Sequence, residues 1–240
     1  MGIRFQLGLK LQIACKIPKV DLLLQLSNEI EVTKKIKNIV FDLGGVILTL
    51  DRDEAVRRFV EIGLDQAEDL LDPYHQKGIF LALEEGKLSS EDFYQVFRQI
   101  AGKPISNDAI DYGWLGFIKE VPEYKLDLLE SLRKDYRIYL LSNTNPIIMG
   151  WANGPLFSCR KKPLVQYFDK MYLSYKIGFT KPDPRIYQYL LQDSGIVPQE
   201  TLFIDDGMAN IEAGKSLGMI TYQPENGEDF SEVIIKMLND

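Results

Sequence analysis

The chain has 240 residues, 45% of them hydrophobic and 26% charged, which is typical of a folded globular protein and excludes a disordered, collagen-like or disulfide-framework chain. Its net charge of −7 argues against a protein whose whole surface binds nucleic acid or an anionic membrane. The two cysteines, Cys15 and Cys159, lie far apart without metal-site spacing, so we expect a reducing compartment.

Residues 1–35 precede the first strand signal and form an N-terminal extension whose role the sequence does not indicate. Residues 22–30 have the apolar spacing of an amphipathic helix. Lys10 interrupts the apolar part of the segment and Gln12 fits a leader cleavage motif badly, so we predict a cytoplasmic protein. The chain has no run of about 18 apolar residues, and we expect no membrane-spanning helix.

From residue 36 onward, short apolar runs alternate with helical patterns. Buried parallel strands are predicted at 39–41, 138–141, 171–173 and 202–204, where β-branched and aromatic residues cluster. One helix has clear ends, with Asp183 as its cap, Pro184 at its first position and Gly195 as its stop. The alternation predicts an α/β fold with a doubly wound, Rossmann-like parallel sheet built from residues 36–52 and 122–240.

Residues 53–121 hold helical patterns without a convincing buried strand, which predicts an all-helical insertion. Within it a helix begins at Ser89 or Ser90 and ends before Gly102. Its predicted apolar face consists of Phe93, Val96, Phe97 and Ile100. An insertion after the first strand of an open sheet lies above the carboxyl ends of the strands, where such folds bind ligands. We therefore expect a cap over the site.

Acidic residues follow two of the predicted strands directly. Asp42 comes after residues 39–41 and precedes a glycine pair, and Asp205 and Asp206 come after residues 202–204. If the two strands are neighbours, Asp42 and Asp205 converge, and such close carboxylates require a neutralising cation. Mg²⁺ suits a few carboxylates, waters and substrate phosphate. Asp206 and Asn210 are candidates for supporting the ion, and Asn210 is equally a candidate helix cap.

Polar residues after the strand at 138–141 and a lysine before a rigid turn complete the candidate site. Ser142, Asn143 and Thr144 offer a hydroxyl and amide donors for phosphate oxygens. Lys181 precedes Pro182 beside a predicted helix N-terminus, a setting that favours stabilisation of phosphoryl charge.

These segments, in this order, resemble the haloacid dehalogenase-like hydrolase (HAD) superfamily. The matching motifs are residues 41–46, 141–143, 181–182 and 204–206 with Asn210. The resemblance implies a phosphatase in which Asp42 forms an aspartyl phosphate, with Mg²⁺ held by Asp42, the backbone carbonyl of Gly44 and Asp205. It also implies that Ser142, Asn143 and Lys181 bind the phosphoryl group, and that residues 53–121 are the family's helical cap. The expected partner is a small phosphorylated metabolite, not nucleic acid or a membrane.

One position departs from most phosphatases of this family, in which a second Asp stands two residues after the nucleophile and protonates the leaving group. Here that residue is Gly44, which has no proton to give. The motifs and the segment 84–89 look most like the α-D-glucose-1-phosphate phosphatase branch, whose anomeric leaving group suits a site without this acid. A sugar phosphate is thus the expected substrate. Glu84 is interpreted as a charge on the cap surface.

Two alternative functions remain open. The first is a 2-haloacid dehalogenase, which also lacks the second acid, although the pair Asp205 and Asp206 favours phosphate with Mg²⁺. The second is a non-catalytic binding protein on the same fold, which the retention of Asp42 and Lys181 disfavours. The sequence does not indicate the oligomeric state.

Overall fold

The computed structural model describes residues 36–72 and 76–239. The predicted extension, residues 1–35, lies outside the described residues. No helix in the part that is described has both the length and the apolar character needed to cross a membrane.

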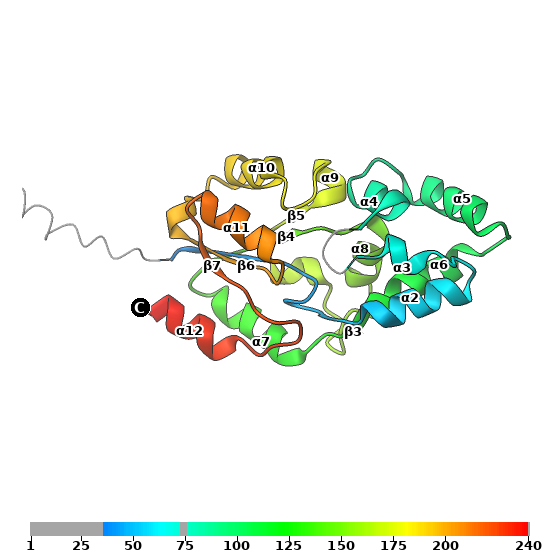
Figure 1. Cartoon of the computed structure of the whole chain (residues 1–240). Helices are drawn as coiled ribbons and strands as arrows, with labels where there is room; N and C mark the ends of the chain where they lie inside the picture. Colours follow the sequence, from blue (N-terminus) through cyan, green and yellow to red (C-terminus); the bar gives the residue numbers. More distant parts are fainter. Residues whose placement is uncertain (1–35, 73–75, 240) are drawn as a thin grey trace, which may run out of the picture. The chain divides into compact units, whose positions relative to one another are not determined.

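The core is a five-stranded parallel sheet in the order β5-β4-β1-β6-β7 (Figure 1). Its strands are β1 (Asn38–Phe41), β4 (Arg137–Ser142), β5 (Lys170–Leu173), β6 (Thr201–Ile204) and β7 (Ile220–Tyr222). Strand β1 is central, and its last residue, Phe41, is in register with Leu140 of β4 and Ile204 of β6. The residues that follow β1, β4 and β6 therefore meet at one edge of the sheet.

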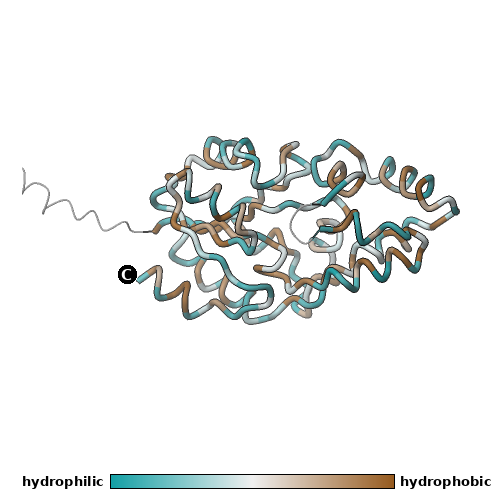
Figure 2. The backbone as a smooth tube through the Cα atoms, viewed as in Figure 1, coloured by the Kyte–Doolittle hydropathy of each residue, from teal (hydrophilic) through white to brown (hydrophobic). Residues whose placement is uncertain are grey.

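Helices cover both faces of this sheet (Figure 1). They are α7 (Glu123–Leu132), α8 (Pro146–Ala152), α9 (Ser174–Ile177), α10 (Pro184–Ser194), α11 (Met208–Ser216) and α12 (Ser231–Asn239), with the short 3₁₀ turns η2 (Leu164–Tyr167) and η3 (Pro198–Glu200). Successive side chains of a strand point to opposite faces of the sheet. Val40 belongs to the hydrophobic cluster that includes residues of α10 and α11, whereas Ile39 and Phe41 belong to the cluster that includes residues of α7 and α12. The hydrophobic residues accordingly concentrate along the central strands (Figure 2).

A group of helices follows β1, and we call it the cap. It consists of α2 (Arg52–Glu61), α3 (Ala67–Leu70), α4 (Gly78–Glu84), α5 (Ser90–Ala101), α6 (Asn107–Trp114) and the 3₁₀ turn η1 (Leu115–Phe117). A short antiparallel ribbon of β2 (Thr49–Leu50) and β3 (Ile118–Glu120) joins the two connections between core and cap. Aromatic rings fill the centre of the cap, with Phe59, Phe80, Phe93 and Trp114 in mutual contact.

The structure confirms the predicted fold class, a doubly wound parallel sheet with a helical cap. The predicted helix ends are also confirmed: Asp183 and Ser89 cap α10 and α5, and Gly195 and Gly102 end them in the left-handed conformation. The ribbon β2–β3 and the edge strand β7 were not predicted, because strands of two or three half-buried residues carry little periodicity.

The predicted apolar face of α5 is wrong at one position. Phe93 and Phe97 are fully buried, but Ile100 is 40% exposed and Tyr94 is buried instead. The neighbouring cap helices cover the first turns of α5, where the Tyr94 hydroxyl donates to Asp111 of α6. Ile100 lies in the last turn, beyond that contact.

The backbone of the cap approaches the backbone of the core at Gly86, two residues after α4. Gly86 has a φ of +66°, and a Cβ atom built on it would lie 2.2 Å from the carbonyl oxygen of Tyr175 in α9. Only glycine tolerates both this conformation and this distance. The contact fixes where the end of α4 enters the site.

We predict that Gly86→Ala destabilises the protein more than Gly102→Ala. Gly102 has the same φ of +66°, but a Cβ atom at this position would meet open space. Gly102→Ala should therefore lower the free energy of unfolding only by what the left-handed conformation costs an alanine, about 1–2 kcal/mol. Gly86→Ala must in addition separate α4 from α9. Urea denaturation of both variants measures the difference, and equal losses would contradict the close contact.

Candidate active site

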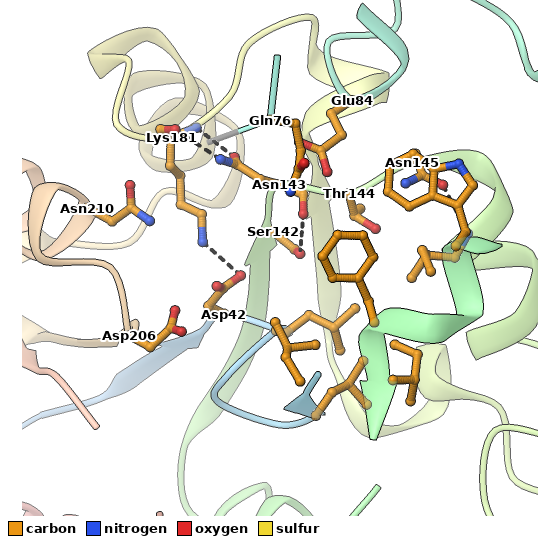
Figure 3. A pocket seen from close by; sticks show the side chains of 18 residues that line it. Asp42, Gln76, Glu84, Ser142, Asn143, Thr144, Asn145, Lys181, Asp206 and Asn210 are labelled. Atoms are coloured by element: carbon orange, nitrogen blue, oxygen red, sulfur yellow. Dashed lines mark hydrogen bonds and ion pairs between the residues drawn. The ribbon is translucent and has the colours of Figure 1, made fainter. Parts of the chain in front are cut away.

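The carboxylates predicted to converge do so at the carboxyl edge of the sheet. Asp42 follows β1, and Asp205 and Asp206 follow β6, the neighbouring strand. One oxygen from each of the three carboxylates lies within 4.8 Å of the others. The prediction that Asp42 and Asp205 meet is therefore confirmed. Figure 3 shows Asp42 and Asp206 side by side at the floor of a pocket.

The Lys181 ammonium lies between two of these carboxylates. Its Nζ is 2.8 Å from Asp42 Oδ1 and 2.6 Å from Asp205 Oδ2, and its side chain is 1% exposed. A buried ammonium without partners destabilises a folded protein, and so does a pair of close carboxylates. Here the two carboxylates neutralise the ammonium, and the ammonium reduces the repulsion between the carboxylates. The lysine thus holds the ends of β1 and β6 at a fixed separation.

The second oxygen of Asp205 is occupied as well. Asp205 Oδ1 accepts from the backbone N–H of Gly207 at 2.9 Å and from Asn210 Nδ2 at 2.8 Å. Of the two roles predicted for Asn210, the structure therefore shows the contact with the acidic pair, and α11 has no side-chain cap. Asp206 forms no ion pair among the described residues. Its side chain lies against Gly45, where a Cβ atom would be 2.1 Å from Asp206 Oδ2.

Burial and mutual repulsion shift the ionisation of the cluster. Burial raises the pKa of Asp42 to about 6, with Lys181 opposing and Asp205 adding to the shift. Burial, Asp42 and Asp205 raise the pKa of Asp206 to about 7. For Lys181, burial lowers the pKa, but the two facing carboxylates outweigh it and leave the pKa above its ordinary value. The raised pKa values of Asp42 and Asp206 reflect three carboxylates that face one ammonium.

The donor set fits Mg²⁺. It offers only oxygen ligands, which this cation prefers, and three carboxylates opposed by one ammonium leave a charge that a divalent ion compensates. Gly45 has a φ of +72°, and the absence of a side chain there leaves the space that Asp206 occupies. The carboxylates of Asp42, Asp205 and Asp206 thus form a candidate site for this cation.

The end of β4 supplies the opposite side of the pocket. Ser142 and Asn143 both line it, but the Asn143 side chain is engaged, since its Oδ1 accepts from Lys181 N at 2.7 Å and its Nδ2 donates to Lys181 O at 2.9 Å. Asn143, predicted to bind phosphate, thus positions the lysine through its side chain.

A residue that sequence reasoning missed supports the loop after Asp42. Lys125 of α7 is 1% exposed, and its Nζ donates to the carbonyl oxygen of Val46 at 2.5 Å while lying over the ring of Phe230. Burial lowers the pKa of Lys125, against the attraction of Asp229 and other acidic residues. A single lysine in an amphipathic helix gives no sequence signal for such a role.

The pocket is a cavity of about 110 Å³ between core and cap. Glu84, at the end of α4, lines it and is 8% exposed. The interpretation of Glu84 as a charge on the cap surface is therefore wrong, because the contact at Gly86 turns the end of α4 inward. Burial, together with repulsion from Asp42, raises the pKa of Glu84 to about 8. Figure 3 shows Glu84 and Gln76 across the pocket from Asp42.

Comparisons with known proteins agree with this geometry. A family model described as haloacid dehalogenase-like hydrolase matches residues 36–218. The D-ribitol-5-phosphate phosphatase of Bacteroides thetaiotaomicron is 52% identical over 204 residues, which are 85% of this chain and 99% of that protein. The chain belongs to the haloacid dehalogenase-like hydrolase family. A phosphorylated carbohydrates phosphatase of Thermotoga maritima is 26% identical, over 75% of this chain and 81% of that protein.

Solved structures of this family have the same fold. A predicted HAD-like family hydrolase from Porphyromonas gingivalis is 44% identical with a TM-score of 0.83, covering 86% of this chain and 99% of that one. A HAD family enzyme from Bacteroides thetaiotaomicron, in complex with magnesium and inorganic phosphate, is 41% identical with a TM-score of 0.76, covering 82% of this chain and 98% of that one. The predictions of the superfamily and of a hydrolytic enzyme are confirmed, whereas the glucose-1-phosphate branch stays a prediction.

The ionisation of Glu84 predicts a pH-dependent change in stability. In the metal-free protein its pKa rises from 4.5 to about 8, so the folded state binds more protons than the unfolded state between these pH values and loses stability as the pH rises. Glu84→Gln removes this loss. Near pH 4.5 the variant should have the same free energy of unfolding as the wild type. Its free energy of unfolding should then exceed that of the wild type by an amount that grows up to about pH 8 and reaches at most about 5 kcal/mol. Urea denaturation with a chelator measures the gain, which a pH-independent difference would contradict.

Proposed function

We propose that this protein is a Mg²⁺-dependent phosphatase of a small phosphorylated polyol or sugar, acting through an aspartyl phosphate on Asp42. The observation that carries the proposal is the position of Lys181 between Asp42 and Asp205, with Asp206 beside them at the floor of one cavity. The substrate class is supported by the names of the relatives, a D-ribitol-5-phosphate phosphatase and a phosphorylated carbohydrates phosphatase.

The reaction has two displacements at phosphorus. A carboxylate oxygen of Asp42 attacks the phosphoryl group, the bond between phosphorus and the ester oxygen breaks, and the freed alkoxide takes up a proton. Water then attacks the aspartyl phosphate, its proton is lost, and the bond to Asp42 breaks, which releases inorganic phosphate and restores the carboxylate. Positioning and charge stabilisation supply most of the acceleration in such transfers.

Three groups of the chain position the phosphoryl group in this proposal. Lys181 stabilises its charge from the side of Asp205, and Ser142 offers a hydroxyl at the end of β4, with the backbone amide of Asn143 beside it. Lys181 also keeps Asp42 ionised by opposing the effect of burial on its pKa.

The residues that would hold Mg²⁺ are Asp42, the backbone carbonyl of Gly44 and the acidic pair. The ion would neutralise the carboxylates and the phosphoryl oxygens. Within the pair, both oxygens of Asp205 already accept from Lys181, Gly207 and Asn210. This favours Asp206 as a direct ligand, in addition to the Asp205 expected from the sequence.

The glycine at position 44 favours a second candidate substrate. Without a side-chain acid there, the leaving oxygen takes its proton from water or from a group of the cap, which slows poor leaving groups most. An anomeric sugar phosphate such as glucose 1-phosphate has a better leaving group than a primary polyol phosphate. The dehalogenase alternative is disfavoured by the third carboxylate, which has no task in halide displacement.

We predict that Asp42→Asn lowers kcat for phosphate release at least ~10³-fold, because the amide is not a nucleophile. The fold should persist, since Lys181 retains its contact with Asp205. The measurement is phosphate release from D-ribitol 5-phosphate, glucose 1-phosphate and phenyl phosphate with Mg²⁺, beside thermal denaturation. Asp69→Asn, at an exposed position of α3, is the matched control and should remain active. Unchanged activity of Asp42→Asn would refute the assignment of the nucleophile.

A second prediction concerns the leaving group. The wild type should hydrolyse anomeric and aryl phosphates faster than simple alkyl phosphates, and Gly44→Asp should raise kcat for the alkyl esters at least ~10-fold relative to the aryl esters. The atoms nearest to a Cβ at position 44 belong to the movable Leu50 side chain, the first at 2.9 Å. Gly44→Ala adds the same Cβ without an acid and serves as the control. Equal gains in the two variants would show that the missing acid is not what limits alkyl esters.

A further inference from the structure

Three side chains that line the cavity each have one buried polar atom without a hydrogen-bond partner among the described residues. These atoms are Gln76 Oε1, Trp114 Nε1 and Asn145 Nδ2. The three side chains are between 1% and 7% exposed. Buried polar groups in proteins are nearly always paired. Three unpaired atoms around one cavity therefore point to a ligand with matching polar groups.

The orientation of both amides is fixed by contacts with the backbone. Gln76 Nε2 donates to Asp72 O at 2.9 Å, which leaves Oε1 as the free acceptor. Asn145 Oδ1 accepts from Ile147 N and Ile148 N, at 3.0 and 3.1 Å, and thereby caps α8, which leaves Nδ2 as the free donor. Reversing either amide would break these bonds, so the unpaired atoms follow from the hydrogen-bond network.

The fourth polar group of this wall is the Glu84 carboxyl, which forms no ion pair within the described residues. It enters the cavity from the cap, as Gln76 does, while Asn145 enters from the core (Figure 3). Trp114 is held by the aromatic rings of the cap, with Phe80 at 5.1 Å and Phe117 at 5.9 Å between ring centroids. Gln76, Glu84 and Asn145 lie across the pocket from Asp42 (Figure 3), on the side that the organic part of an ester would occupy, and Trp114 lines the same cavity.

We propose that Gln76, Glu84, Trp114 and Asn145 form a hydroxyl-binding wall that selects phosphate esters of polyhydroxylated carbon chains. The inference rests on the proposed phosphatase function and specifies its substrate. A hydroxyl both donates and accepts, so a row of hydroxyls satisfies the donors of Trp114 and Asn145 as well as the acceptor of Gln76. A hydrocarbon chain would leave all of them unpaired, which costs roughly tenfold to a hundredfold in affinity for each atom.

The test compares esters that differ only in their hydroxyls. D-ribitol 5-phosphate is paired with pentyl phosphate, and myo-inositol 1-phosphate with cyclohexyl phosphate, all with Mg²⁺. The wild type should prefer the hydroxylated member of at least one pair by about 10²-fold or more in kcat/KM. The ratio within a pair cancels effects on the phosphoryl group, which both members share.

Trp114→Phe removes the indole N–H and keeps an aromatic ring in the cap, and it should reduce the ratio about tenfold. The chain has two tryptophans, so Trp151→Phe is the matched control and should leave the ratio unchanged. Should Trp114→Phe fail to fold, Asn145→Asp removes the second donor while keeping the acceptor that caps α8, and should also reduce the ratio. An undiminished ratio in the folded variants, or a wild type indifferent to the hydroxyls, would overturn the proposal.

Binding separates this inference from the proposed function. In Trp151→Phe the remaining tryptophan, Trp114, lines the cavity, and its fluorescence should respond to D-ribitol 5-phosphate or myo-inositol 1-phosphate at lower concentrations than to the matched esters. Selective binding without phosphate release would overturn the phosphatase function and support the wall. Phosphate release without selectivity would overturn the wall and support the function.

Discussion

The site depends on one buried ammonium. Asp42, Asp205 and Asp206 lie at the carboxyl edge of the sheet, where burial and repulsion oppose their ionisation. Lys181 reaches two of them and is itself held by the amide of Asn143 at the end of β4. One residue thus joins β1, β4, β6 and the start of α10. Its ion pairs stabilise the metal-free site, and the remaining negative charge is what makes a divalent cation fit.

The parts of the site that the sequence predicts are those set by local order along the chain. Asp42 and Asp205 directly follow apolar strands, and parallel neighbours must bring such residues together. The caps Ser89 and Asp183 act within one helical turn, so their effect is readable in the sequence. The burial of Glu84 is not, because it depends on the contact between Gly86 and the carbonyl of Tyr175, 89 residues apart in the chain.

The same distinction explains what the sequence left open about the substrate. The groups that meet phosphate come from strand ends, whose positions the sheet determines. The polar atoms proposed to meet the organic part come from separate segments of cap and core, and their lack of a partner becomes visible only once their other hydrogen bonds are known. Neither Gln76 nor Trp114 belongs to a motif. A sequence therefore reveals the chemistry of this family more readily than the compound on which a member acts.

The side-chain amide of Asn145 has two roles. Its oxygen caps α8, and its nitrogen has no partner among the described residues at a position that lines the cavity, so most substitutions there would loosen a helix of the core while changing what the cavity accepts. Gln76 belongs to the cap and lies outside its helices, since α4 begins at Gly78, whereas Trp114 is packed among the aromatic rings of the cap. Attempts to redirect this enzyme toward other esters have the greatest freedom at position 76, whereas positions 114 and 145 tie the choice of substrate to the integrity of the scaffold.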